Sequence, residues 1–575
     1  MSAIIVRREV PGVLPLTGSP LLDRIYTARR VRSARELDHR LECLTPPAFE
    51  GLGEALALLA EALERRWRIL VVGDFDADGA TGTALAVRGL RAMGARDVRF
   101  RVPDRFRFGY GLSPDLVAAL APERPQLLIT VDNGISSLQG VAAARELGCR
   151  VLVTDHHLPG PELPAADAII DPNQPGDESG ANNLAGVGVI FFVLAALRRH
   201  LDDAGWFARE NLPRPNLAGF LDLVALGTVA DVVPLDHGNR VLVEQGLRRI
   251  RAGRCVPGIS ALARVAGCRQ AQLDATDIGF RLGPRLNAAG RLEDMSIGID
   301  CLLSDDPAEA EAVAARLDGL NRERRAIGER MQTEAEQALE ILQLDAALPY
   351  GLCLFDEGWH QGVLGILAAR VRERTHRPVI ALAPDGEDLV KGSARSVPGL
   401  HIRDSIAAVD GRHPGRIRKF GGHASAAGLT LAREALPLFQ DAFDAEVRRH
   451  LGPEDLRGVL YSDGELGAGE FSLPVAEALR AAGPWGQGFP EPLFDGVFQV
   501  LAHRPVGRNH CQLTLRPQGS DISVQAMAFN RVLPWSAPWP ELRIAYRLEV
   551  NEFRNRRSAR LIVEHLELAD DRHPY

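Results

Sequence analysis

Short apolar runs alternate with longer amphipathic stretches between residues 66 and 172. The runs are RILVVG, DVRFRV, QLLITV, RVLVTD and DAIIDP, which begin at residues 68, 97, 126, 150 and 167. Apolar runs this short and this rich in β-branched residues predict buried strands. The stretches between them have helical spacing, so the region predicts βαβ units and a parallel sheet.

The rest of the chain changes pattern several times. Residues 1–65 predict a helical extension, and the first α/β domain, 66–317, continues past its sheet as a mostly helical part. Residues 318–345 are charged and free of proline, which predicts one long helix. A second α/β pattern covers 346–455, and short alternating strands with Gly and Pro turns predict a small β-barrel over 465–570. The predicted fold class is therefore α/β, with two α/β domains joined by a long helix and followed by a barrel.

Composition narrows the class of protein further. The chain has 575 residues, of which 46% are hydrophobic and 25% charged, as in ordinary globular proteins. No apolar run reaches the roughly 18–20 residues that span a bilayer, and the N-terminal residues lack the apolar core of a secretory signal. The seven cysteines form no C-x-x-C pair, so neither a disulfide framework nor a zinc site is expected. We expect a cytoplasmic protein without membrane association.

The net charge of −8 argues weakly against wholesale wrapping by nucleic acid, but basic residues cluster in two places. Each cluster is either a solvated face or a nucleic-acid contact. The first comprises Lys391, Arg395, His401, Arg403, Arg412, His413, Arg416, Arg418, Lys419 and His423. The second comprises Arg504, Arg508, His510, Arg516, Arg543, Arg547, Arg554, Arg556, Arg557 and Arg560.

The stretch VVGDFDADGATG places Asp74, Asp76 and Asp78 at alternate positions ahead of a glycine. The same spacing opens a helix–loop–helix calcium site, but such a loop needs a Glu at its twelfth position, where this chain has Leu85. A predicted strand also leads into the stretch, where a calcium loop would have a helix. The three acids therefore lie between a strand and a helix, and the calcium alternative is disfavoured.

The next strands of the sheet end in the same polar manner. Asp132 and Asn133 follow one strand, and Asp155, His156 and His157 follow the next. Such residues taken singly are ordinary turn or helix-capping residues, but in an open α/β sheet these strand ends converge. Asp231, in the apolar stretch LDLVALGTVADVVPL, is a further buried acid that needs a partner. A divalent cation would relieve the repulsion, and a mixed Asp/His set favours Mn²⁺ or Mg²⁺ over zinc.

In this order and spacing, the motifs GDFDADG, VDNG, TDHH and GTVADVVPL resemble the DHH phosphoesterase superfamily. Four later motifs extend the resemblance to its associated DHHA1 domain: GPRLNAAGRLEDM, EGWHQGVLGILAARV, KGSARSV and GGHASAAGL. One departure is Phe489 in PWGQGFPEPLF, where the resemblance predicts Asn.

The resemblance implies a DHH domain at 66–317, a DHHA1 domain at 346–455 and an OB-like barrel at 465–570. It also implies a metal-dependent exonuclease that degrades single-stranded DNA from the 5′ end to mononucleotides, in DNA repair and recombination. Two alternatives stay open: a phosphodiesterase of short oligonucleotides or cyclic dinucleotides, and an inactive DNA-binding or replication-scaffold relative. The implied partners are single-stranded DNA, a single-strand-binding protein and a RecQ-type helicase, and the enzyme is expected to be a monomer.

The resemblance also assigns roles to individual residues. Two cations, Mn²⁺ or Mg²⁺, are expected on Asp74, Asp76, Asp78, Asp132, His156 and Asp231, with Asp132 as the bridge. His157, Asp132, Asp74 and Asp155 are the expected catalytic residues; Asp74 and Asp155 either bind metal or orient the histidines. His157 either meets the scissile phosphate or makes a structural hydrogen bond. The expected substrate-binding residues are Arg105, Arg285, Asn287, Trp359, His360, Ser393, Arg395, Gly421, Gly422 and His423, with core packing an equal alternative for Trp359.

Overall fold

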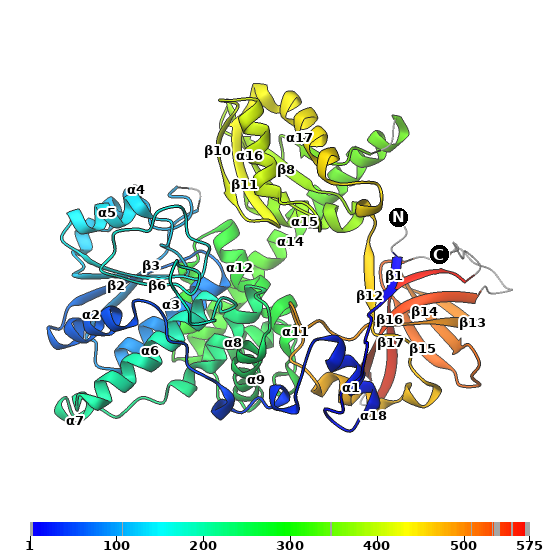
Figure 1. Ribbon diagram of the computed structural model, residues 1–575, viewed down its shortest axis with the longest axis horizontal. Coiled ribbons are helices and arrows are strands. Elements are labelled where there is room, and N and C mark those ends of the chain that lie inside the picture. The colour runs from blue at the N-terminus through cyan, green and yellow to red at the C-terminus, as the bar shows by residue number, and fades with distance from the viewer. Residues whose placement is uncertain are drawn as a thin grey trace. The chain divides into compact units, whose positions relative to one another are not determined.

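The computed structural model describes residues 4–105, 107–345, 348–507, 509–531, 533, 541–553 and 556–569. The chain forms two compact units, coloured along the chain in Figure 1. The sheet unit comprises Arg29–Arg322 and Gly483–Glu491. The barrel unit comprises Met1–Ala28, Glu323–Ala482 and Pro492–Tyr575. Each unit is described separately below.

The sheet unit is built on five parallel strands in the order β3-β2-β4-β5-β6, which confirms the predicted parallel sheet. The strands are β2 (Arg68–Gly73), β3 (Asp97–Arg101), β4 (Leu127–Val131), β5 (Arg150–Thr154) and β6 (Ala168–Ile170). Every residue of β4 is buried, as expected for a strand covered on both faces. Side chains of α4 (Pro114–Leu120) and α5 (Leu138–Glu146) share one core with β2, β4 and β5.

Helices complete the sheet unit around α3 (Ala77–Ala92). The others are α2 (Leu52–Glu64), α6 (Gly186–Asp203), α7 (Trp206–Arg209), α8 (Leu221–Ala230), α9 (His237–Arg251), α10 (Pro257–Val265), α11 (Ala275–Asp277), α12 (Gly283–Leu292) and α13 (Ser296–Leu303). Helix α8 is almost entirely apolar and its first eight residues are buried, so it forms part of a core with α3, α6 and α9.

The segment Gly483–Glu491 belongs to the sheet unit although the barrel follows it in sequence. Phe489 is buried, stacks on Trp485 with ring centroids 5.1 Å apart, and lies under the guanidinium of Arg240 at 4.2 Å. The residue that departs from the expected Asn is therefore a packing residue that holds this segment on the sheet unit.

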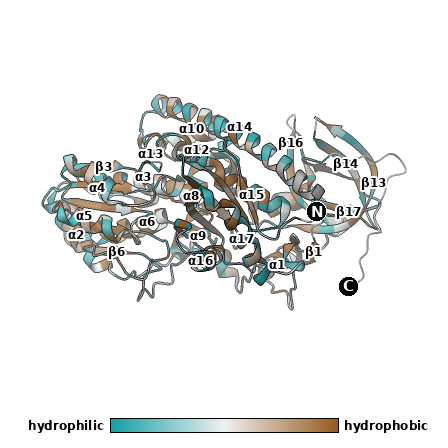
Figure 2. Ribbon diagram, turned by 90° about the horizontal axis from the view of Figure 1, so that it is seen from above, coloured by the Kyte–Doolittle hydropathy of each residue, from teal (hydrophilic) through white to brown (hydrophobic). Residues whose placement is uncertain are grey.

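Helix α14 (Pro307–Asp345) runs through the boundary between the units and starts before the expected residue 318. Figure 2 shows hydrophilic and hydrophobic residues mixed along it, as in a helix that is only partly buried. None of the described helices is both long and apolar enough to cross a membrane.

The barrel unit contains a second sheet in the order β10-β11-β9-β8-β7. Its strands are β7 (Leu352–Phe355), β8 (Val379–Asp385), β9 (Leu389–Arg395), β10 (Ile417–Gly422) and β11 (Ala426–Ala432). Only β7 and β8 pair in parallel. The helices are α15 (Leu364–Thr375), α16 (Ile402–Arg412) and α17 (Leu436–His450). This arrangement confirms the second α/β domain of the predicted fold class.

A closed barrel follows in the order β13-β14-β15-β17-β16, which confirms the predicted small barrel. Its strands are β13 (Phe494–Val506), β14 (His510–Pro517), β15 (Val524–Ala528), β16 (Glu541–Phe553) and β17 (Arg556–Leu568), and α18 (Leu473–Ala481) packs on it. Several of its arginines pair with acids of the same unit, among them Arg543 with Glu567 and Arg547 with Glu564. Arg508 and Arg554 lie outside the described residues.

The N-terminal extension is not purely helical, which corrects the expectation for residues 1–65. It contains β1 (Ile4–Arg7), which pairs in parallel with β12 (Val459–Ser462), and then α1 (Pro20–Ala28). Arg7 donates to Asp495 of β13 from Nε at 2.9 Å and from Nη2 at 2.9 Å, and Ser462 donates to the same carboxylate at 2.6 Å. Asp495 is fully buried and joins β1, β12 and β13.

Replacing Asp495 with Asn is expected to destabilise the barrel unit at neutral pH by on the order of 2 kcal/mol, the scale of hydrogen bonds to a charged group. Burial alone would raise the pKa of Asp495, but the bonds from Arg7 and Ser462 outweigh it and lower the pKa. A carboxyl group with a lowered folded pKa stabilises above its unfolded value, about 3.9. That stabilisation is lost as the pH falls through the folded value.

Thermal unfolding of wild type and Asp495→Asn between neutral and acid pH checks this prediction. The two melting temperatures should differ at neutral pH and converge in acid, and the exposed control Asp521→Asn should match wild type throughout. A difference that grows towards acid pH would contradict the assigned role.

Candidate metal centre

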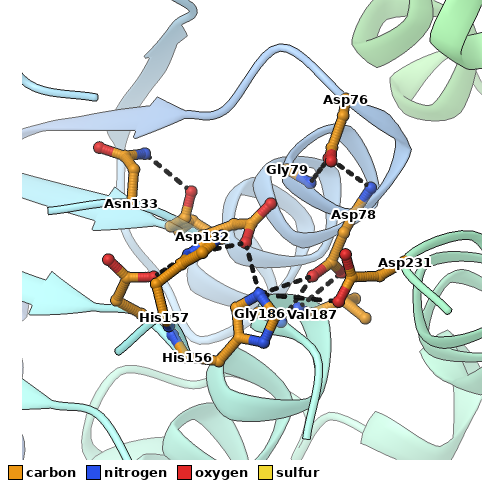
Figure 3. A network of polar contacts seen from close by, with 12 residues as sticks. Asp76, Asp78, Gly79, Asp132, Asn133, His156, His157, Gly186, Val187 and Asp231 are labelled. Atoms are coloured by element: carbon orange, nitrogen blue, oxygen red, sulfur yellow. Dashed lines mark hydrogen bonds and ion pairs between the residues drawn. The ribbon is translucent and has the colours of Figure 1, made fainter. Parts of the chain in front are cut away.

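The acidic residues predicted at the strand ends come together at the carboxyl edge of the sheet (Figure 3). Asp74 follows β2, Asp132 follows β4, and Asp155, His156 and His157 follow β5. Three groups of residues could each hold a metal ion, because the potential ligand atoms inside each group all lie within 4.8 Å of one another. They are Asp74 with Asp76 and Asp132, Asp78 with His156 and Asp231, and Asp132 with His156 and His157. Asp132 and His156 each belong to two of these groups, and together they connect the cluster.

Asp78 lies in the first turn of α3, and its carboxylate accepts two backbone hydrogen bonds from the start of α6. Gly186 N–H donates at 2.6 Å and Val187 N–H at 3.0 Å. A side chain at Gly186 would place its Cβ 2.6 Å from the Cβ of Asp132, so only glycine lets α6 begin this close. Burial, followed by the charge of Asp231, raises the pKa of Asp78 well above its usual range.

Asp76 caps the N-terminus of α3. Its Oδ1 accepts from the N–H groups of Asp78 at 2.9 Å and Gly79 at 3.0 Å, a standard use of Asp at this position. The cap fixes the side chain beside Asp74 and Asp132, so one residue both starts the helix and contributes a carboxylate to the cluster.

His156 faces three carboxylates. Its Nε2 is 3.1 Å from Asp132 Oδ1, 3.7 Å from Asp231 Oδ2 and 4.0 Å from Asp78 Oδ2. Burial, more than the charge of His157, lowers the pKa of His156 to about 4, so the ring is neutral at physiological pH. A backbone hydrogen bond with Leu184 engages the ring, and Nε2 itself has no hydrogen-bond partner among the described residues.

The cluster contains buried polar atoms that the described residues leave unsatisfied. Asp74 Oδ1, Asp132 Oδ1 and His156 Nε2 have no hydrogen-bond partner in the described part of the chain. Burial and the neighbouring Asp78 raise the pKa of Asp132 well above its usual range, and burial with Asp76 does the same for Asp74. Buried, mutually repelling acceptors of this kind fit a divalent cation, and an O/N donor set suits Mn²⁺ or Mg²⁺.

Asp155 has a different environment from the other acids. Its Oδ2 accepts from Ile135 N–H at 2.9 Å, and its Oδ1 accepts from His156 N–H at 2.8 Å and lies 2.8 Å from His157 Nδ1. Burial alone would raise the pKa of Asp155, but the bond with His157 and these backbone donors lower it. Asp155 is therefore ionised and fully hydrogen-bonded, which suits a residue that orients His157.

His157 is the one histidine of the pair that carries charge. Burial alone would lower its pKa, but the hydrogen bond and the charge of Asp155 outweigh burial and raise the pKa to about 9. The Tyr110 hydroxyl lies 3.1 Å from His157 Nδ1, and the two rings meet edge to face. The protonated ring is partly exposed at the cluster, where it can meet an anion.

Two aromatic residues near the cluster were not predicted from the sequence. Tyr110 is half exposed and contacts Phe75 with ring centroids 6.1 Å apart, while the guanidinium of Arg105 lies 4.2 Å from the Phe75 ring. Their places in the sequence could have indicated both residues. Phe75 lies inside the acidic motif, between Asp74 and Asp76, and Tyr110 follows the predicted substrate-binding residue Arg105 in the same loop.

The motif GPRLNAAGR supports the acidic loop. Asn287 accepts from the Ala77 N–H through Oδ1 at 2.8 Å, and a side chain at Gly290 would collide with the Phe75 carbonyl. Arg285 donates to Asp318 from Nε at 3.0 Å and to the Arg281 carbonyl at 2.6 Å. The structure thus gives Asn287 a structural contact with the loop and pairs Arg285 with an acid of its own unit.

The remaining candidates lie in the barrel unit. Arg395 donates to Ser393 Oγ at 3.2 Å, and both face the start of α15, where a side chain at Gly365 would lie 2.8 Å from the guanidinium. Gly421 and Gly422 end β10 at an exposed turn, and the positive φ of Gly422 and its contact with Ala426 require glycine. The main-chain N–H of His423 closes that turn on the Ala426 carbonyl at 2.8 Å.

Trp359 and His360 are less available than expected. Trp359 is buried in an apolar core and donates from Nε1 to Glu334 at 2.9 Å, so the packing alternative is correct and its ring cannot stack on a base. His360 accepts from the Gly362 N–H at 3.1 Å as the cap of a short turn.

A parallel sheet whose carboxyl edge gathers six aspartates and two histidines is typical of phosphoesterases of the DHH type. The family model described as DHH family, N-terminal domain, matches residues 68–228, the DHHA1 domain model matches 347–449, and the RecJ OB domain model matches 462–565. The chain belongs to the RecJ family.

Two kinds of relative support that assignment. The single-stranded-DNA-specific exonuclease RecJ of Dickeya dadantii is 51% identical over 562 residues, which cover 97% of each chain. Crystal structures of RecJ from Thermus thermophilus, one with Mn²⁺ and one with Mg²⁺, superpose with TM-scores of 0.81 and 0.75. They are 31% and 30% identical, cover 98% of this chain, and are themselves covered over 79% and 78%.

Proposed function

We propose that this protein is a metal-dependent exonuclease that hydrolyses single-stranded DNA from its 5′ end to mononucleotides. The observation that carries the proposal is the set of unsatisfied buried acceptors on Asp74, Asp132 and His156. Relatives that match this chain over 97% of their length are named single-stranded-DNA-specific exonucleases, which supports the substrate. The resemblance of this chain to that family also suggests work in DNA repair and recombination, in the cytoplasm, as a monomer alongside a single-strand-binding protein and a RecQ-type helicase.

Two divalent cations would occupy the two groups of ligands that Asp132 connects. Asp74 and Asp76 would hold one ion, and Asp78, His156 and Asp231 the other. Bound divalent cations supply Lewis acidity that activates an attacking water and offsets the charge of the phosphodiester. The protein's part is to fix these side chains: the α3 cap holds Asp76, the start of α6 holds Asp78, and Leu184 sets the tautomer of His156.

His157 would bind the scissile phosphate. Its protonated ring donates hydrogen bonds, and Asp155 holds that ring in place at 2.8 Å. A charged donor aimed at a phosphoryl oxygen stabilises the negative charge that grows there during hydrolysis. Because Asp155 uses both oxygens on His157 and on backbone N–H groups, it acts through His157 and not as a metal ligand.

The substrate panel that tests the proposal uses purified protein with Mn²⁺. Long single strands labelled at the 5′ or the 3′ end, the matching duplex, and a dinucleotide are compared in parallel. We expect rapid release of the 5′ label as a mononucleotide from the single strand and much slower attack on the duplex. Preferential cleavage of the dinucleotide would favour the short-oligonucleotide alternative, and no cleavage of any substrate would favour the inactive relative.

The terminal phosphate has a candidate binding pair in Ser393 and Arg395. Burial lowers the pKa of the Arg395 guanidinium without neutralising it, and the guanidinium packs so closely on α15 that a Cβ at Gly365 would lie 2.8 Å from it. A guanidinium and a hydroxyl match the oxygens of a terminal phosphate, which carries more charge than an internal one. The turn at 421–423 could add backbone N–H donors.

Replacing Arg395 with Ala is expected to reduce kcat/KM about tenfold to a hundredfold on 5′-phosphorylated strands, since a charge-assisted hydrogen bond contributes roughly 1.5–3 kcal/mol. The loss on 5′-hydroxyl strands should be much smaller. Arg457→Ala, which removes an exposed arginine of the same unit that belongs to neither basic cluster, serves as the control and should match wild type. Equal losses on both substrates would show that Arg395 does not recognise the terminal phosphate.

A further inference from the structure

Phe280 is exposed to an unusual degree for an aromatic side chain. Its exposed fraction is 81%, and no other large apolar residue in the described ranges exceeds 62%. The neighbouring Ile278 and Leu282 are fully buried, so the segment itself is firmly packed. The exposure of Phe280 is thus a property of a fixed backbone position.

The helix that carries Phe280 is widened at this point. The segment η6 (Ile278–Leu282) is a π-helix between α11 and α12, and the Gly283 N–H donates to the Ile278 carbonyl five residues back. Pro284 explains the widening, because it has no N–H to donate to the Phe280 carbonyl and its ring would clash with that carbonyl in an α-helix. Such π turns often occur at functional sites, where they redirect a side chain.

The widened turn packs against the end of α8, directly before the metal centre. A side chain at Gly283 would lie 3.2 Å from the Ala230 Cβ, and one at Gly279 would lie 3.6 Å from Val229. The next residues along the chain are Asp231 of the cluster and Val232. Phe280 therefore projects from a turn that is in contact with the helix supplying one of the candidate ligands.

Val232, two residues past the end of α8, also has an unusual conformation. It is 62% exposed and has a φ of 64°, a region that a β-branched residue rarely adopts. Backbone strain of this kind persists where the surrounding structure imposes it, and it concentrates at functional sites. Arg281 follows Phe280; its side chain is 53% exposed, and its Nε lies 3.4 Å from Asp277 Oδ1.

We propose that Phe280 forms an apolar platform that stacks on one unpaired base of the DNA strand held at the metal centre. This inference rests on the proposed function. A strand whose phosphate meets the carboxylate cluster would carry its neighbouring bases past the turn that packs on the end of α8. An aromatic ring binds any base through its face, so the platform would favour unpaired over paired DNA without reading sequence.

Single abasic sites placed at successive positions from the 5′ end test the proposal. Affinity is measured in EDTA, and kcat/KM with Mn²⁺, for wild type, Phe280→Ala and Phe280→Tyr. Removing the ring should weaken binding and kcat/KM about tenfold on intact strands, the scale of one base–aromatic stack. At one abasic position, the affinity and kcat/KM of wild type should fall by the same factor as on removing the ring, and Phe280→Tyr should behave like wild type. At that position, Phe280→Ala should show no further decrease relative to its own values on the intact strand.

Leu147→Ala removes an exposed apolar side chain from the same unit, after α5, and should behave as wild type on every strand. If the affinity and kcat/KM of wild type and Phe280→Ala fall by equal factors at every abasic position, Phe280 does not stack on a base. Its exposed ring would then contact something else, such as another protein. The affinities in EDTA do not depend on hydrolysis. A wild type that binds but never cleaves would therefore count against the proposed function alone.

Discussion

An Asp132→Asn variant should lose at least about a thousandfold in kcat, because Asp132 belongs to the group of Asp74 and Asp76 and its Oδ1 lies 3.1 Å from His156 Nε2 of the other group. Asn is the suitable replacement, since Asp132 has a φ of 64° and Asn tolerates this region better than Ala. The fold should survive. Burial and Asp78 already raise the pKa of Asp132, so losing its charge relieves repulsion when no cation is bound.

Two measurements separate the catalytic effect from a structural one. Mn²⁺ should raise the melting temperature of wild type and have little effect on that of Asp132→Asn, as expected when a cation binds only the folded site. Asp97→Asn alters an acid at the start of β3, at the other end of the sheet, and should keep full activity. An Asp132→Asn enzyme with more than about a tenth of wild-type turnover, a loss below ~1.4 kcal/mol, would refute the bridging role.

His157→Gln is the second variant with a large expected effect, a loss of about a hundredfold to a thousandfold in kcat. The protonated ring is the charged donor at the cluster, and contributions of this size are typical of acid–base and electrostatic groups. Gln can still donate a hydrogen bond but carries no charge. Metal-dependent stabilisation should remain close to that of wild type, because His157 is assigned to the phosphate.

The partner variant Asp155→Asn tests whether Asp155 works through His157. Its loss in kcat should resemble that of His157→Gln, and the double variant should lose little more than either single one, since residues that act as a unit are not additive. His200→Gln, on an exposed position of α6, is the matched control. If the fold losses in kcat of the two single variants multiply in the double variant, Asp155 has an independent role, such as binding metal.

Much of the centre follows from the sequence for a simple physical reason. Parallel strands align their carboxyl ends, so acids that follow β2 and β4 must meet whatever the details of packing. The barrel and the long helix are likewise predicted by local periodicity. The apolar stretch around Asp231 likewise marks it as an acid that needs a partner, but its place in the cluster depends on how α8 packs against α3.

Other features depend on contacts between residues far apart, which no local pattern contains. The pairing of β1 with β12 is one case, and the contact of Asn287 with Ala77 is another. Trp359 was equally compatible with stacking and with packing until its surroundings were known. The fully bonded state of Asp155 likewise depends on the backbone of Ile135, which only the folded loop brings near.

The central claim is that this cluster is a two-cation centre joined by Asp132. Anomalous diffraction from crystals grown with Mn²⁺, recorded at the manganese edge, tests it most directly. We expect two anomalous peaks at the carboxyl edge of the sheet, one beside Asp74 and Asp76 and one beside His156 and Asp231, with Asp132 contacting both. Crystals that show Mn²⁺ elsewhere and no peak within reach of Asp132 would contradict the account.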